Sequence, residues 1–306
     1  MDELKLVERL RSEVPLDIDV TGAENRWRRR AHAAPVRRRR PLLLSGVAAA
    51  ACAGVVATFL VNQHDGGRMA NVAAVLDQAA DRAAEDTAPR PDQFVYQEGV
   101  SRQRVGGVGR WYEVRIQSWL SVGGKGSGLV ISKNSIRPRP GEVLRPEGED
   151  VMVPCPAVPP IDRPYLDALP TDTGALLDLL ADQGEGGRGD RQWAAASDLI
   201  GEPAAPRVRA ALYRAIAEIP GVRLRDDAVD AVGRHGVAIG RVQDGIRDEI
   251  IFDRASHRYL GGRTVIAGKG HPFGPPGTTT GSSALLNTGI VDDAPTPGPG
   301  ATPSGC

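Results

Sequence analysis

A run of twenty residues without a charge, Leu42 to Val61, constrains this chain more than any other feature. At a rise of about 1.5 Å per residue, a helix of that length covers about 30 Å, the thickness of the hydrocarbon core of a bilayer. The run is rich in alanine, so a buried helix of a soluble protein is the alternative interpretation. The flanking charges favour the membrane, and residues 42–61 are predicted to form a transmembrane helix.

The charges on either side of this run also predict its orientation. The first basic residue after it is Arg68, whereas four arginines directly precede it. Short segments rich in arginine stay on the cytoplasmic side, so we expect a single-pass protein of the cell membrane with residues 1–40 in the cytoplasm and the rest outside. A cleaved signal peptide has a shorter apolar region, of about 7 to 15 residues. The membrane-orienting residues are Arg37, Arg38, Arg39 and Arg40.

The net charge of zero hides two unequal parts. Residues 1–40 carry 11 basic and 7 acidic residues, and the remainder carries 27 and 31. A basic segment beside a membrane suits anionic lipids of the cytoplasmic leaflet. The lipid bilayer is therefore the expected partner. Contact with nucleic acid is the weaker alternative, and no nucleic-acid partner is predicted.

The first fourteen residues carry apolar side chains at helical spacing, which suggests a short amphipathic helix ending at Pro15. Such a helix is marginal alone, so a loosely helical tail is one interpretation. The other is a helix that docks on a cytoplasmic regulatory protein. The candidate partner-docking residues are Leu4, Val7, Leu10 and Val14.

The chain beyond residue 69 alternates between two hydrophobic periods, typical of helices and of strands. Prolines between residues 134 and 164 predict an irregular connection there. Helices are expected over about 70–84, 173–180, 191–200 and 206–219, and strands near 93–97, 113–122, between 222 and 266, and over 284–291. Helices gathered between groups of strands predict an α+β fold. We expect a curved antiparallel sheet with helices on one face, by analogy a lipoprotein-carrier-like half-barrel.

These patterns divide the chain into five segments. They are a cytoplasmic basic tail (1–40), a transmembrane helix (42–61), a linker (62–69), an extracytoplasmic α+β domain (70–292) and a disordered Pro/Gly tail (293–306).

No arrangement of residues predicts catalysis, a cofactor or a metal site. The three cysteines (Cys52, Cys155 and Cys306) lack the spacing of metal ligands. A disulfide between Cys155 and Cys306 is an alternative that the sequence does not decide. His235, His257 and His271 also lack such spacing and are expected in turns.

Two further groups admit a functional and a structural interpretation. Asp248, Glu249 and Asp253 could supply paired carboxylates, but solvated positions on an edge strand are the simpler interpretation. Trp111 and Trp119 could line a groove or belong to the core, and the core is favoured because the chain has so few aromatic residues.

Five blocks of the sequence resemble an actinobacterial family of uncharacterised single-pass membrane proteins. They are PDQFVY (91–96), LPTDTGALLDLL (169–180), ALYRAIAEIPGV (211–222), IIFDRASHRYLG (250–261) and SALLNTGIVD (283–292). Genes of this family often accompany sigma factors of the extracytoplasmic-function type, so the resemblance implies a regulatory role. Residues 1–40 contain only His32 and no cysteine, unlike a zinc-type anti-sigma factor.

Three hypotheses follow. The first is a non-enzymatic envelope sensing or regulatory protein whose residues 1–40 contact a cytoplasmic regulator such as a sigma factor. The second is a membrane-anchored carrier domain that holds a lipid or another apolar ligand in the concave face of the sheet. The third is an exported enzyme, which a pocket with convergent ionisable groups would indicate.

Overall fold

The computed structural model describes residues 71–107, 109–124, 126–154, 159–182 and 184–304. The predicted transmembrane helix, the tail at 1–40 and the linker at 62–69 lie outside these residues, as do all three cysteines. Within the described part of the chain, no helix combines the length and the apolar character needed to cross a bilayer.

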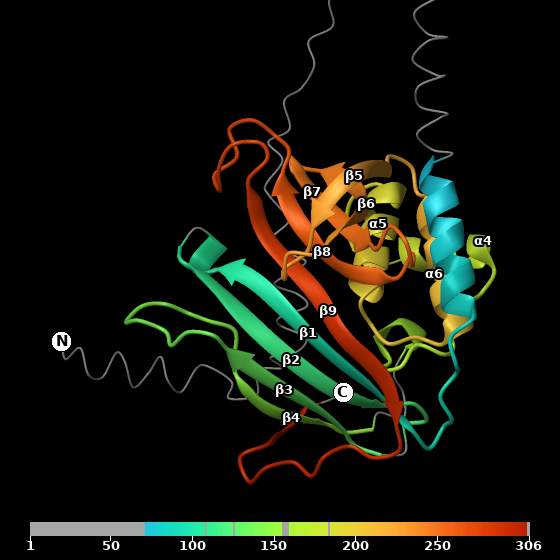
Figure 1. Ribbon diagram of the computed structural model, residues 1–306, viewed down its shortest axis with the longest axis vertical. Helices are drawn as coiled ribbons and strands as arrows, with labels where there is room; N and C mark the ends of the chain where they lie inside the picture. Colours follow the sequence, from blue (N-terminus) through green and yellow to red (C-terminus); the bar gives the residue numbers. More distant parts are fainter. Residues whose placement is uncertain (1–70, 108, 125, 155–158, 183, 305–306) are drawn as a thin grey trace, which may run out of the picture. The chain divides into compact units, whose positions relative to one another are not determined.

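A single sheet of ten strands organises the described residues (Figure 1). The order across the sheet is β10-β4-β3-β2-β1-β9-β8-β7-β6-β5, and every neighbouring pair is antiparallel except β10 and β4. The strands are β1 (Phe94–Arg104), β2 (Trp111–Ser121), β3 (Gly128–Asn134), β4 (Gly148–Met152), β5 (Arg223–Val229), β6 (His235–Gln243), β7 (Ile246–Phe252), β8 (Tyr259–Ile266), β9 (Thr279–Val291) and β10 (Thr302–Ser304).

Within the described residues, four helices supply the rest of the core. Residues 71–84 are helical, followed by α4 (Thr173–Ala181), α5 (Arg188–Leu199) and α6 (Pro206–Glu218), with short 3-10 turns η1 (Val105–Gly107) and η2 (Pro160–Asp162). Figure 1 shows the helices gathered beside the half of the sheet that contains β5 to β8. This arrangement confirms the predicted α+β class, the open curved sheet and the helices on one face.

Local sequence explains where these helices begin and end. The Asp172 side chain accepts a hydrogen bond from the Ala175 N–H (2.8 Å) and caps α4, as its residue type favours. Pro206 starts α6 at the position where a missing N–H costs nothing. Gly221 follows that helix with a φ of +87°, a conformation that glycine adopts readily.

Apolar side chains fill the interface between the helices and the sheet. Leu212 and Ile216 of α6 belong to one core with Ile239 of β6 and Phe252 of β7. All four side chains are at most 2% exposed. The Tyr213 ring meets Phe252 edge-on at 5.3 Å, and burial raises the pKa of Tyr213 to about 12.

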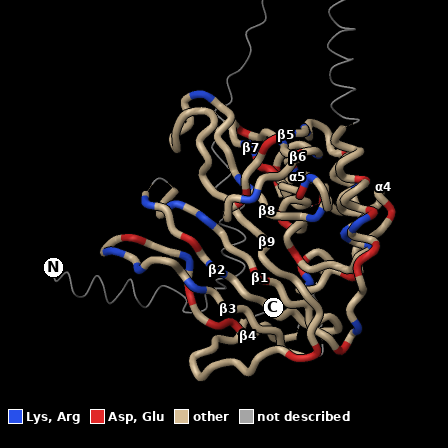
Figure 2. Tube along the Cα trace, viewed as in Figure 1, with Lys and Arg blue, Asp and Glu red and all other residues tan. Residues whose placement is uncertain are grey.

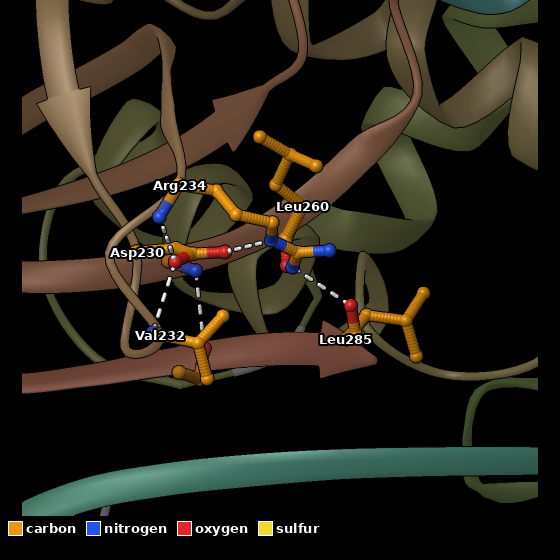
Figure 3. Close-up of polar contacts among 7 residues, drawn as sticks. Asp230, Val232, Arg234, Leu260 and Leu285 are labelled. Atoms are coloured by element: carbon orange, nitrogen blue, oxygen red, sulfur yellow. Dashed lines mark hydrogen bonds and ion pairs between the residues drawn. The ribbon is translucent and has the colours of Figure 1, made fainter. Parts of the chain in front are cut away.

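The β5–β6 turn is fastened to the sheet by an ion pair (Figure 3). The Asp230 carboxylate has no exposed surface and accepts from Arg234 Nε (2.6 Å) and from the N–H of Val232 (3.0 Å). The same guanidinium donates to the C=O groups of Leu260 in β8 (2.9 Å) and Leu285 in β9 (2.8 Å). The turn is thereby attached where β8 and β9 separate.

Three expectations need correction. Residues 134–164 are not wholly irregular, because β4 lies in the proline-free stretch between Pro146 and Pro154. The segment 293–306 is not a disordered tail throughout, because β10 pairs with β4 and the Val153 N–H donates to the Ser304 C=O (2.9 Å). Pro303 is compatible with this pairing, since proline is tolerated in edge strands.

The third correction concerns β7, which is an interior strand between β6 and β8 rather than an edge. Glu249 is 3% exposed and forms ion pairs with Arg247 Nε (2.6 Å) and Arg263 Nε. Asp248 accepts from the Thr264 hydroxyl (2.8 Å). The Glu249 carboxylate is therefore neutralised by arginines within the sheet and not solvated at its edge.

Candidate functional site

The candidate site is the face of β1 and β2 that points away from the helices. Alternation along the strands separates the two faces: Val95 of β1 packs in the core with the helices. Its neighbour Tyr96 faces the other way, paired in register with Trp119 of β2. We call this surface the aromatic–arginine face; it includes the side chains of Tyr96, Glu98, Arg102, Arg104, Trp111, Glu113, Arg115, Gln117 and Trp119, whereas Val100 between them is buried.

One end of this face is built around Trp111. The guanidinium carbons of Arg104 and Arg102 lie 4.7 Å and 5.8 Å from the centre of the indole ring. Both separations are within the range of cation–π attraction. Glu113 forms an ion pair with Arg102 (3.2 Å), and both side chains remain nearly half exposed. The tryptophan is thus held in a fixed position while its surroundings stay open to solvent.

The other end of the face is built around Tyr96 and Trp119. Their ring centres are 5.0 Å apart at an interplanar angle of 44°. The Tyr96 hydroxyl accepts from Gln117 Nε2 (3.0 Å) and donates to Glu98 Oε2 (3.3 Å). Glu98 also pairs with Arg115, whose side chain is 56% exposed. Polar contacts along the strands therefore orient both aromatic rings.

These groups suit recognition of another molecule rather than a bond-making reaction. The face offers three aromatic rings and three arginines against two glutamates. Aromatic and arginine side chains are enriched where proteins contact partners, because they supply a large contact area and, for arginine, several hydrogen-bond donors. Figure 2 shows basic positions recurring along β1 and β2.

A second surface feature lies between the helix at 71–84 and the β7–β8 turn. It is an open, polar hollow of about 430 Å³ lined by Gln78, Asp81, Arg82, Glu85, Ala255, Ser256 and His257. Its charges are already engaged: Arg82 pairs with Glu85, and Asp81 pairs with Arg214 (2.7 Å). The hollow therefore offers less for a ligand than the aromatic–arginine face does. In the described ranges, no three His, Cys, Asp or Glu side chains converge as metal ligands.

The structure describes only some of the candidate residues that the sequence predicted, and it places two of them on a different face than expected. The membrane-orienting arginines and the docking stripe Leu4–Val14 lie outside the described residues. The core interpretation of Trp111 and Trp119 was wrong, since both are partly exposed on the aromatic–arginine face. Sequence reasoning missed Arg102 and Arg104, although the alternation that places β2 residues on two faces extends to them once β1 is known to reach residue 104.

Comparisons with known proteins give only distant structural similarities. No family model and no curated protein matches the chain. A solved complex of MucA and MucB from Pseudomonas aeruginosa is similar at 11% identity and a TM-score of 0.30, over 74% of this chain and 59% of that chain. A structure described as an outer membrane lipoprotein-sorting protein domain, from Vibrio parahaemolyticus, is similar at 11% identity and a TM-score of 0.24, over 70% and 91%.

Likenesses of this size carry no argument about function, because function resides in sites rather than in folds. The relationship to the actinobacterial membrane family stays a prediction from the five sequence blocks.

Proposed function

We propose that the chain is a single-pass membrane protein whose extracytoplasmic domain recognises an envelope component without catalysing a reaction. The observation that carries the recognition half is the Trp111 ring flanked by Arg102 and Arg104 on an exposed sheet face. The uncharged run at 42–61 supports the anchor. In this proposal, residues 1–40 contact a cytoplasmic regulatory protein such as a sigma factor.

The rival hypothesis of an apolar carrier requires space between the sheet and the helices. On the β5–β8 half, that space is filled by side chains with no exposed surface, including Ile216, Ile239 and Phe252. Interiors packed in this way admit a ligand only if the structure opens. The filled interface supports recognition on the outer face over carriage inside.

The membrane half of the proposal is tested by fractionation and a fusion. The full-length chain should stay with membranes after carbonate extraction, and a reporter fused after residue 306 should be active only outside the cytoplasm. Release by carbonate, or a cytoplasmic reporter, would remove the anchor from the proposal.

The recognition half is tested by photo-crosslinking in intact cells. A benzoylphenylalanine at position 111 should give one defined crosslinked product, and the same probe at position 242, where Val242 of β6 is 49% exposed, should not. Arg104→Glu, which reverses the charge beside the ring, should abolish the product. Equal crosslinking at both positions, or a product insensitive to Arg104→Glu, would show that the face is not a specific site.

The cytoplasmic half has its own test. Leu10→Asp places a charge within the Leu4–Val14 stripe and should reduce co-purification of a cytoplasmic protein with the full-length chain at least tenfold. Ser12→Asp, off that stripe, is the matched control. Loss with both variants would attribute the association to net charge and not to the stripe.

A further inference from the structure

Strand β9 continues well beyond its pairing with β8. The last residue of β9 that pairs with β8 is Ala284, opposite Gly261. Pairing with β1 continues as far as Val291, opposite Phe94. No described strand lies on the β8 side of residues 286–291, and Figure 1 shows β9 running on past the end of β8. The sheet thus contains an open edge in its middle, which we call the β9 edge.

Two backbone hydrogen bonds at the ends of β1 determine which backbone groups of the β9 edge point away from β1. The Val122 N–H donates to the Gln93 C=O (3.1 Å), and the Val105 N–H donates to the Arg110 C=O (3.1 Å). Odd-numbered residues on β1 therefore bond toward β2, and even-numbered residues bond toward β9.

The register then identifies the outward residues on β9. Tyr96 is opposite Gly289 and Phe94 is opposite Val291, so these two residues of β9 bond to β1. The backbone N–H and C=O groups of Thr288 and Ile290 consequently point to the open side. Thr288 is exposed and Ile290 is 36% exposed, and a Cβ placed on Gly289 would meet nothing within 4 Å.

The chain protects its two outer sheet edges but not this one. β5 carries Arg223, Arg225, Asp226 and Asp227 together with a register shift, and β10 carries Pro303. Charges, bulges and prolines are the usual means of preventing strand addition at an edge. Residues 285–291 contain no charge and no proline, and they include the β-branched Thr288, Ile290 and Val291.

We propose that the β9 edge binds an extended segment of a partner protein, which adds to the sheet as a strand in line with β8. Backbone groups of the segment pair with those of Thr288 and Ile290, and its side chains are uncharged to match the edge. This is strand addition, in which the main chain supplies affinity and alternate side chains supply specificity. The site is separate from the aromatic–arginine face, and neither depends on the other.

The dimensions of the edge favour a short segment over a second copy of the chain. Six residues extend about 20 Å. The Arg234 guanidinium on the Leu285 carbonyl bounds one end (2.8 Å), and the Arg90–Asp292 ion pair (3.2 Å) marks the other. Stable protein dimers bury about 1,200 Å² or more, which an edge of this length does not supply, whereas a peptide strand uses all of it.

The test uses the full-length chain in detergent and a fluorescein-labelled peptide of eight alternating threonines and valines, with an alternating threonine–aspartate peptide as control. We expect saturable binding of the first peptide only. Ile290→Lys, which places a charge on the edge and keeps the backbone intact, should weaken binding at least tenfold. Gly289→Ala, with free space for its Cβ, should leave binding within twofold.

Amide hydrogen exchange gives a second, independent measurement. In the free protein the amides of Thr288 and Ile290 should exchange quickly and those of Gly289 and Val291 slowly. The peptide should slow the first pair at least tenfold. Binding of both peptides alike, binding unaffected by Ile290→Lys, or no added protection would overturn the proposal. Protection of Thr288 and Ile290 that grows with protein concentration alone would overturn it in favour of a second copy.

Discussion

At the scale of single residues, the Asp230–Arg234 pair shows how one side chain can secure a turn. The carboxylate is fully buried, and the guanidinium also reaches two carbonyls on neighbouring strands. We predict that Arg234→Ala lowers the free energy of unfolding by about 1–3 kcal/mol, because it leaves a buried carboxylate with backbone donors only. Urea denaturation measures this, with the exposed Arg225→Ala on β5 as a control expected within about 0.5 kcal/mol of the parent.

Glu142 makes a second residue-scale contact that depends on pH. Arg110 Nε donates to both of its carboxylate oxygens (3.1 and 3.2 Å), and these bonds, with the Arg139 N–H (2.9 Å), lower the pKa of Glu142 from 4.5 to about 2. A carboxylate whose pKa is lowered by folding stabilises the protein above its unfolded pKa, and this contribution is lost as the pH falls toward the folded value.

Glu142→Gln should therefore reduce the acid sensitivity of the fold. From about pH 5 down to about pH 3, the Tm of the parent should fall more steeply than the Tm of the variant, and the two slopes should agree near neutral pH. Thermal melts followed by circular dichroism across this range provide the measurement. Parallel slopes throughout would mean that the Arg110–Glu142 contact contributes nothing to folding.

At the scale of elements, β10 is the least expected part of the sheet, and truncation tests it. A chain that ends at residue 300 lacks β10, so the Val153 N–H loses its acceptor, the Ser304 carbonyl. We predict at least tenfold faster amide exchange at Val153 with little change in Tm, because β10 is short and at the margin of the sheet. The amide of Ile131 in β3 serves as the internal control, and unchanged exchange at Val153 would place β10 elsewhere in solution.

The elements also show how far sequence reasoning reaches. Period-two alternation located β2, whose Tyr112, Val114 and Leu120 are buried, and the 3.6-residue period located α4 and α6, which bury one face in the main core. The strands β3, β4 and β10 were missed, since β4 and β10 are short and flanked by glycine or proline, and β3 lies between β2 and β4 without a clear alternating pattern. Whether such a segment forms a strand depends on pairing partners that are distant in the sequence. A local residue pattern contains no information about those partners.

The candidate site was predictable only in part for the same reason. Alternation separated the side chains of β2 into two faces, but it could not show which face the helices cover. Trp111 and Trp119 were assigned to the wrong side because a large aromatic ring is more often buried. What places them outside is the register, because Val95 of β1 packs against the helices and the two tryptophans lie on the opposite face of the sheet.

At the scale of the molecule, the structure separates a filled face from an open one. The helices cover one face of the β5–β8 half, and the aromatic–arginine face of β1 and β2 stays accessible on the opposite side of the sheet. The Glu249 carboxylate of β7 forms ion pairs with Arg247 of the same strand and with Arg263 of β8, so charged contacts also connect these interior strands. A rigid sheet with one accessible face suits recognition, since the contacting side chains are already in place before a partner binds.

The packing of the helices on the sheet gives a prediction that distinguishes recognition of an envelope component from carriage of an apolar ligand. Ile216 of α6 has no exposed surface and belongs to the core shared with β6 and β7. Ile216→Ala should lower the free energy of unfolding by about 2–5 kcal/mol. The near- and far-UV circular dichroism signals should be lost in one coincident transition, because the helices and the sheet unfold together. Ile290→Ala on the exposed β9 edge is the control, expected within about 1 kcal/mol of the parent. A small effect of Ile216→Ala, or separate transitions for the helices and the sheet, would instead reveal an interface loose enough to open for an apolar ligand, and the carrier hypothesis would then be preferred.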